Sequence, residues 1–154
     1  MKAQAWGFDL IIAVMIFVVG ILAFYFYSIN YSGEGSVGFI SLKEEGSLIA
    51  ESLLSSGSPA DWNASNVVRI GIYDNGRINE TKLEEFYGMD YSTTKSLFRV
   101  RDDYYLNFSS SLEIGGNPVD YIGLLPSGEE NLAKVERVIV FNDKVGTMEV
   151  FVWN

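Results

Sequence analysis

The sequence contains no cysteine and no histidine. Without cysteine, no disulfide can stabilise the fold, and thiolate nucleophiles and cysteine-bound metals are excluded. Without histidine, the chain lacks the commonest general base and the commonest transition-metal ligand. An enzyme built from this sequence would depend on Asp, Glu, Lys, Ser and Tyr alone. We therefore predict a protein that is not an enzyme and uses no cofactor or metal.

Positive charge is also scarce in this chain. Lys and Arg total 11 against 20 Asp and Glu, which gives a formal net charge of −9 at pH 7. An acidic surface repels the phosphates of nucleic acids and the headgroups of anionic lipids. We therefore expect no nucleic acid among the partners of this protein.

Paired acidic residues are the nearest approach to a chemical motif, since the chain has neither a G-x-S-x-G elbow nor a P-loop. Adjacent carboxylates could serve acid–base chemistry or bind Ca²⁺. Neighbours on a helix or turn point in different directions, however, and none of the pairs has EF-hand spacing. We interpret them as solvated surface charge. The pairs are Glu44-Glu45, Glu84-Glu85, Asp102-Asp103 and Glu129-Glu130.

One long apolar run dominates the N-terminal part of the chain. No charged residue occurs from Leu10 to Gly33, and Leu10–Ile29 is almost entirely apolar. At about 1.5 Å per residue, a helix over this run spans roughly 30 Å, the thickness of the hydrocarbon core of a bilayer. A soluble domain of this size does not need a helix that is apolar on every side. The run therefore predicts a membrane-inserted segment.

The flanks of this segment predict its orientation. Lys2 and the α-amine precede it, and an acidic region follows it. The positive-inside rule then places the N-terminus in the cytoplasm and the following domain outside, with the segment either uncleaved or cut ahead of the apolar run. Residues 24–27 (Phe-Tyr-Phe-Tyr) then lie at the outer interface, where aromatic rings are favourable. Alternatively, these rings pack against neighbouring helices.

Asp9 stands at the start of the apolar run. A carboxylate is costly in lipid and usually needs a partner there. In one interpretation, Asp9 marks the cytoplasmic interface and reaches water. In the other, Asp9 has an assembly role: it pairs with an amine or side chain of a neighbouring subunit inside a helical bundle and holds that subunit in register.

Residues 30–58 form a second region, between the apolar run of residues 1–29 and a domain at residues 59–154. Glycine disfavours helix, so the glycines within residues 30–38 predict a kink or a short break. Beyond them, apolar residues recur at helical spacing, which predicts an amphipathic helix with one buried face that ends at Ser55–Pro59. The predicted stripe is Phe39, Leu42, Gly46, Ile49 and Leu53, with Lys43, Glu44, Glu45 and Glu51 mostly off it.

Residues 59–154 predict a small domain with an antiparallel β-sheet and short helices, so the fold class is α+β. Trp62 is expected to anchor a loop at residues 59–66 before a strand at 67–73. Asp74-Asn75-Gly76 is a strong turn signal. Asn79 is expected to cap a helix at residues 81–89, and Ser92 or Thr93 a further turn through Leu97.

Strand signals dominate the rest of the chain. Val135–Phe141 and Met148–Trp153 are rich in β-branched and aromatic residues and predict a closing hairpin. Earlier strands are expected at residues 104–108, 112–114 and 119–124, with Gly115–Pro118 as a turn and residues 126–131 as a loop. Four valines suit one face of the closing hairpin: Val138, Val140, Val150 and Val152.

Asn-x-Ser/Thr triplets begin at Asn30, Asn63, Asn79 and Asn107. They are candidate N-glycosylation sites, which agrees with a domain outside the cell. The alternative is that they are ordinary polar residues of turns and strands. Asn63 and Asn79 are the better acceptors because they lie in loop or cap contexts, whereas Asn107 is expected in a strand.

Lys2-Ala3-Gln4, followed by Asp9 and the apolar run, resembles the class III signal of archaeal type IV pilin-like proteins. In that family a prepilin peptidase cuts after a small residue and ahead of the first mature residue, often Gln. The resemblance implies processing between Ala3 and Gln4, with Asp9 in the place of the family's acidic residue. The fit departs in that Asp replaces Glu one position later, and in the very short leader Met1-Lys2-Ala3.

Two later stretches are similar to archaeal pilin-like proteins as well: residues 57–95 and the closing VFNDKVGTMEVFVWN. The family implies a long N-terminal helix whose lower half packs on an antiparallel sheet domain. It also implies polymerisation through the apolar helices, with copies of this chain or other pilins, and handling by a prepilin peptidase and an assembly platform.

We therefore expect a structural, pilin-like subunit of an archaeal type IV pilus-like surface filament. It would be held in the membrane with an extracellular domain, or lie in an extracellular filament. Two alternatives stay open: a monomeric, single-pass membrane-anchored binding domain, and a pseudopilin-like component of a secretion machine.

Overall fold

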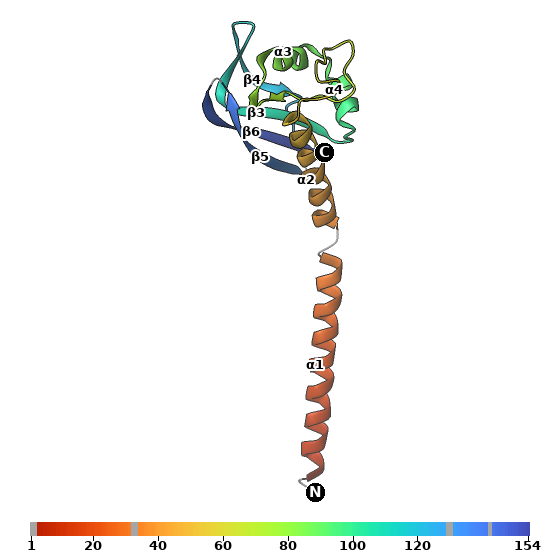
Figure 1. Ribbon diagram of the computed structural model, residues 1–154. Helices are drawn as coiled ribbons and strands as arrows, with labels where there is room; N and C mark the ends of the chain where they lie inside the picture. Colours follow the sequence, from red (N-terminus) through yellow and green to blue (C-terminus); the bar gives the residue numbers. More distant parts are fainter. Residues whose placement is uncertain (1–2, 32–33, 129–130, 142) are drawn as a thin grey trace. The chain divides into compact units, whose positions relative to one another are not determined.

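The computed structural model describes residues 3–31, 34–128, 131–141 and 143–154 (Figure 1). The chain forms two compact units, Met1–Gly38 and Phe39–Asn154. The acidic pair Glu129-Glu130 and the leader residue Lys2 lie outside the described residues. The unit boundary falls within the predicted 30–58 region.

The first unit is helical. Helix α1 runs from Ala3 to Tyr31, and helix α2 begins at Glu34 and continues to Leu53 in the second unit. Ser32 and Gly33, where the break was expected, lie outside the described residues. The long N-terminal helix predicted from the apolar run is confirmed.

The second unit contains an antiparallel sheet of four strands in the order β4-β3-β6-β5 (Figure 1). These strands are β3 (Asp103–Ile114), β4 (Asn117–Gly123), β5 (Leu132–Phe141) and β6 (Lys144–Trp153). A separate hairpin joins β1 (Tyr73–Asp74) and β2 (Arg77–Ile78). Short helices α3 (Glu80–Gly88) and α4 (Tyr91–Phe98) lie between the two sheets in the chain. The predicted α+β fold is confirmed.

One face of the four-stranded sheet forms the core. Tyr104, Leu106 and Phe108 of β3 pair with Val152, Val150 and Met148 of β6, and all six side chains are buried. Alternation along a strand then directs the intervening residues to the other face. That second face is more exposed and carries polar and aromatic side chains.

Helix α2 packs on the buried face through Leu42, Ile49 and Leu53, all fully buried. Gly46 permits close approach, because a Cβ at this position would lie 3.0 Å from Cγ2 of Val135 and 3.3 Å from Cγ2 of Val152. The expected stripe is confirmed except at Phe39, whose side chain is 47% exposed. Each buried Leu or Ile contributes about 1.5–3 kcal/mol of transfer free energy.

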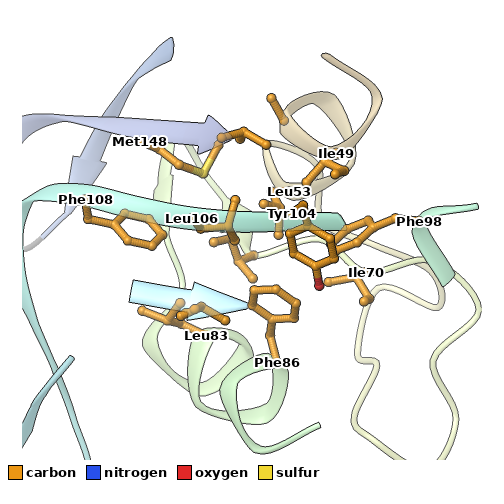
Figure 2. Packing of buried hydrophobic residues seen from close by; sticks show 14 of the residues in the cluster. Ile49, Leu53, Ile70, Leu83, Phe86, Phe98, Tyr104, Leu106, Phe108 and Met148 are labelled. Atoms are coloured by element: carbon orange, nitrogen blue, oxygen red, sulfur yellow. The ribbon is translucent and has the colours of Figure 1, made fainter. Parts of the chain in front are cut away.

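Helices α3 and α4 complete the core with aromatic side chains. Figure 2 shows Leu83 and Phe86 of α3 and Ile49 and Leu53 of α2 converging on the side chains of β3. The Phe86 and Phe98 rings meet edge to face at 5.9 Å, and the Phe98 and Tyr104 rings at 5.4 Å.

The ends of the short helices follow local capping chemistry. Asn79 caps α3 as predicted, because its side-chain oxygen accepts the N–H of Lys82. The cap of α4 was predicted wrongly: it is Asp90, whose carboxylate accepts the N–H of Ser92, rather than Ser92 or Thr93. A carboxylate at this position also interacts favourably with the helix dipole, which explains the preference.

The predicted strand at residues 67–73 is wrong. Only an isolated bridge, Ser58 with Arg69, and the start of β1 at Tyr73 have strand pairing. The segment instead bonds to the end of α2: the N–H of Ile72 donates to Leu53 O, and that of Tyr73 to Ser55 O. The carbonyl groups of Leu53 and Ser55, at and just after the end of α2, therefore accept the hydrogen bonds that a neighbouring strand would otherwise accept.

The turn predicted at Asp74-Asn75-Gly76 is confirmed, whereas the turn predicted at Gly115–Pro118 is shorter than expected, because β4 begins at Asn117. Asn75 and Gly76 take positive φ between β1 and β2, and Gly115 and Gly116 do so between β3 and β4. Trp62 anchors its loop as expected, since it is 3% exposed and its indole N–H donates to Gly71 O at 2.7 Å.

The closing hairpin is confirmed, but its faces were assigned wrongly in β5. Val150 and Val152 are buried, whereas Val138 is 69% exposed and Val140 only partly buried. The register pairs Val150 with Val135 and Val152 with Ala133. A run of consecutive apolar residues does not show which alternate set faces inward, and the register decides it.

Candidate functional site

The candidate site is the surface of α1. The segment Gly7–Ile29 comprises 23 residues with a mean hydropathy of 2.7, and none of it is buried within the protein. At about 1.5 Å per residue it spans roughly 34 Å, slightly more than a hydrocarbon core. By length and composition, α1 is therefore a candidate membrane-spanning helix, and a signal sequence near an N-terminus would have the same properties.

The apolar surface extends round the whole circumference of α1. Consecutive side chains such as Phe24, Tyr25, Phe26 and Tyr27 are each more than half exposed. Because consecutive residues point about 100° apart on a helix, α1 has no polar face in this run. The helix needs an apolar environment on every side.

Asp9 is the only Asp, Glu, Lys or Arg in α1. It lies on the second turn of the helix, its side chain is exposed, and within the described ranges no cation reaches it. The candidate processing residues Ala3 and Gln4 form the start of the same helix. The predicted assembly residue and the predicted processing site are therefore close in sequence on one element.

Glu45 is a buried carboxylate that the sequence analysis assigned to the surface, and this assignment was wrong. It is 9% exposed, while its neighbour Glu44 is exposed. One carboxylate oxygen accepts the backbone N–H groups of Arg101 and Asp102, both at 3.1 Å, and the other lies 3.4 Å from Nε of Arg101. Glu45 therefore fastens α2 to the chain just ahead of β3.

Lys82 and Asp74 form a second internal ion pair. The ammonium lies 2.7 Å from the Asp74 carboxylate and also donates to Ser56 O at 2.8 Å. Asn79 donates to the same carboxylate at 3.0 Å. The Asp74-Asn75-Gly76 stretch is thus a turn, and its Asp74 carboxylate forms an ion pair with the buried Lys82 ammonium.

A third polar cluster lies between α4 and β3. Lys95 and Tyr91 both donate to the Asp103 carboxylate. Burial raises the pKa of Asp103, but the hydrogen bonds from Lys95 and Tyr91 outweigh it, so the pKa stays below its usual 3.8. Burial raises the pKa of Tyr104 to about 12, partly offset by its hydrogen bond with Thr94.

The exposed face of the sheet carries a fourth cluster. The rings of Tyr105 and Phe151 stack in parallel with centroids 4.4 Å apart. Lys134 donates to Glu149 at 2.8 Å, and Asn107 donates to the same carboxylate at 3.1 Å. The hydrogen bond from Lys134 holds the pKa of Glu149 below its usual value.

Two short spacings are reminiscent of enzyme motifs, but their surroundings differ. Ser92-Thr93-Thr94-Lys95 has the S-x-x-K spacing, yet Lys95 bonds to Asp103 and the Ser92 hydroxyl to Asp90. Gly33–Gly38 has the G-x-G-x-x-G spacing, yet it follows α1 and not a strand, as a dinucleotide site requires. Across the described ranges, no three acidic side chains gather in a way that could hold a metal ion.

The candidate glycosylation residues differ in how their side chains are used. Asn63 is exposed, and its side-chain oxygen accepts the N–H of Ser65 in its own triplet. Asn79 is half-buried and bonds through both its oxygen and its nitrogen. Asn107 lies in β3, as expected, and donates to Glu149. Asn63 is therefore the most accessible acceptor of these three.

Comparison with known proteins gave no match to a family model, to a curated protein or to a solved structure. The geometry of α1 and of the sheet domain is therefore the basis for assigning a function.

Proposed function

We propose that the protein is a structural, pilin-like subunit of a type IV pilus-like filament at the cell surface, and that it polymerises through α1. The observation that carries the proposal is the fully exposed apolar surface of Gly7–Ile29. Moving one large apolar side chain out of water is worth about 1.5–3 kcal/mol, so this surface must be covered. Lipid can cover it before assembly, and like helices can cover it afterwards.

The sheet domain supports this division of roles. Among the described residues, those that form its core all lie within Phe39–Asn154 and include the buried part of α2. Because the domain needs no side chain of Gly7–Ile29 for its own core, α1 is available for neighbouring subunits. The filament would then have a core of α1 helices and an outer layer of sheet domains.

Asp9 gives the assembly a register. An unpaired carboxylate among apolar helices costs several kcal/mol, whereas one that meets an amine of a neighbouring subunit is compensated. A subunit displaced along the bundle would lose that compensation. The partners in this proposal are copies of the same chain or other pilins, with a membrane, a prepilin peptidase acting between Ala3 and Gln4, and an assembly platform as the route into the filament.

The acidic sheet domain would face outward, outside the cell. Its net negative charge keeps neighbouring filaments apart and soluble. Accessible triplets such as that of Asn63 would carry the glycans of a surface protein.

The proposal is tested on cells that produce the chain. Shearing should release filaments that contain it, and the native N-terminus should have the mass expected for a chain starting at Gln4. Deletion of residues 1–29 should give a soluble monomer. Robust filaments from the truncated chain would contradict the proposal.

A second candidate function is also supported by the candidate membrane-spanning helix: a monomeric, single-pass anchored domain that binds an external ligand. In that case the chain would be recovered from membranes only with detergent, as a monomer, and never in the sheared fraction. A pseudopilin-like part of a secretion machine would give only short assemblies that stay with the envelope.

A further inference from the structure

An apolar groove with a basic rim lies on the sheet domain and shares no charged residue with the clusters described above. It has a volume of about 720 Å³ and runs between α2, the chain around residue 68 and the end of α4. Leu48 and Val68 line it and are 55% and 66% exposed, and Leu97 adds a partly buried wall. Apolar side chains this exposed, gathered in one hollow, are typical of an interaction surface.

Two arginines give this groove its charge. Arg69 and Arg99 both line it and both are exposed, and in the described part of the chain no carboxylate lies within ion-pairing distance of either. Glu51 also lines the groove. Two arginines and one glutamate leave it with a net charge of +1 on a chain whose net charge is −9.

Helix α3 presents a surface of the opposite kind. Lys82, Leu83 and Phe86 are buried, so its outer stripe consists of Glu80, Glu84 and Tyr87 at i, i+4 and i+7. Tyr87 is 48% exposed. In the described ranges, neither glutamate has an ion-pair partner. The stripe therefore offers two carboxylates and one aromatic ring, and it shares no residue with the groove.

We propose that the groove receives the α3 stripe of a second copy of this chain. The carboxylates of Glu80 and Glu84 meet Arg69 and Arg99, and the Tyr87 ring covers Leu48 and Val68. Charge complementarity favours this occupant: an acidic chain offers few basic surfaces, and a groove placed against another groove would oppose arginines. Only one part of this inference rests on the proposed filament function: the expectation that the contact repeats from head to tail.

Head-to-tail repetition follows if each copy uses its groove for one neighbour and its stripe for another. Such heterologous contacts extend into open assemblies, whereas reciprocal use by two copies closes a dimer. The contact would then add lateral support between sheet domains to the bundle of α1 helices.

The absence of cysteine makes the contact directly testable in the full-length chain. Val68→Cys places a thiol in the groove, and Gly88→Cys places one beside the stripe, where an added Cβ meets nothing within 4 Å. Under oxidation, a mixture of the two single variants should form disulfide-linked heterodimers, each variant alone should form far fewer dimers, and the double variant should form a ladder of higher oligomers.

Charge reversal provides the matched comparison. Arg69→Glu with Arg99→Glu should reduce cross-linking at least roughly tenfold, and Glu80→Arg with Glu84→Arg on the other copy should restore it. Arg137→Glu with Lys144→Glu makes the same change in net charge outside the groove and should leave the yield unchanged. An equal loss in this control would overturn the proposal.

Other outcomes would also overturn it. Efficient dimers of Val68→Cys alone would mean that groove faces groove, and a double variant that stops at dimers would mean reciprocal pairing. Polyphosphate binding that depends on Arg69 and Arg99, without any cross-link, would assign the groove to a polyanion. Filaments of the Val68→Cys, Gly88→Cys double variant that form no cross-link would contradict only the groove assignment, whereas cross-linked oligomers of that variant without filaments would contradict only the filament proposal.

Discussion

The Lys82 ammonium lies 2.7 Å from the Asp74 carboxylate, and only 8% of the lysine side chain is exposed. This pair joins the turn of the β1–β2 hairpin to helix α3. Lys82 also donates to Ser56 O, at the start of the loop that follows α2. One buried cation therefore links three segments of the chain: the β1–β2 hairpin, helix α3 and the loop that follows α2.

Asp74→Asn should destabilise the sheet domain by about 2–4 kcal/mol, because it leaves the buried lysine without its counter-ion. Urea unfolding followed by circular dichroism measures this change. Arg77→Gln, which removes the exposed Arg77–Asp143 pair of the same hairpin, should cost less than about 1 kcal/mol. Equal losses in the two variants would show that burial of Lys82 is unimportant.

Gly46→Leu should lower the free energy of unfolding by about 1–3 kcal/mol through overpacking. A Cβ at Gly46 already approaches Val135 and Val152, so a larger side chain must push α2 away from the sheet. In the same helix, a Cβ added at Gly38 would meet nothing within 4 Å, so Gly38→Leu should cause no loss. Thermal unfolding of both variants checks the difference, and an unchanged melting temperature for Gly46→Leu would contradict the close packing.

Trp62→Phe should cost about 1–3 kcal/mol, since it removes the hydrogen bond to Gly71 O and part of a buried ring. The variant should also lose the blue-shifted part of the tryptophan emission. Trp153→Phe, which alters a more exposed indole, should change stability less. The opposite order would contradict the role of Trp62 as the anchor of its loop.

Stability should fall in acid as the Asp103 and Glu149 carboxylates are protonated. Both pKa values are depressed in the folded state, Asp103 chiefly by Lys95 and Tyr91 against an opposing burial effect, and Glu149 chiefly by Lys134. Their contribution is therefore complete above the unfolded-state pKa values of about 4 and is lost as the pH falls through the lower folded-state values.

The measurement is urea unfolding between pH 7 and pH 2. The combined variant Asp103→Asn, Glu149→Gln should be less stable at pH 7 and should show a flatter decline below about pH 4. Asp143→Asn, which removes only an exposed pair, should leave the decline as it is in the wild type. A combined variant with the wild-type acid dependence would contradict the assignment to these two carboxylates.

Of the candidate glycosylation sites, Asn63 should be occupied and Asn79 should not. The Asn63 side chain is exposed in a turn, whereas the Asn79 amide is committed to Asp74 and to the N–H of Lys82. Peptide mass spectrometry of the protein from its native cells tests this, with Asn63→Gln as the control. Occupancy of Asn79 with an unmodified Asn63 would reverse the expectation.

Much of the fold could be predicted from the sequence because its signals are local. The almost entirely apolar run Leu10–Ile29 specifies the helix, and Asp74-Asn75-Gly76 and Gly115-Gly116 specify turns through residues that accept positive φ. Asn79 caps its helix through a contact only three residues away. Such features depend little on the rest of the chain.

Apart from the cap of α4, which is a local contact between Asp90 and Ser92, the errors concern contacts between distant segments. Glu45 is buried because its carboxylate accepts the backbone N–H groups of Arg101 and Asp102, 56 and 57 residues later in the chain. Val138 is exposed because the register between β5 and β6 directs Ile139 to the core instead. No periodicity within a short window contains this information. The basic groove was missed for the same reason, since Arg69 and Arg99 are brought together only by the fold.

The bond between Glu45 and the amides ahead of β3 has a mechanical consequence. A pulling force on α2 reaches β3, one of the two inner strands of the sheet, through this bond, bypassing the chain between residues 54 and 100. That intervening segment, with its small hairpin and two short helices, is therefore not the only route by which load passes from α2 to the sheet. It can yield or change shape under tension while α2 and the sheet remain joined.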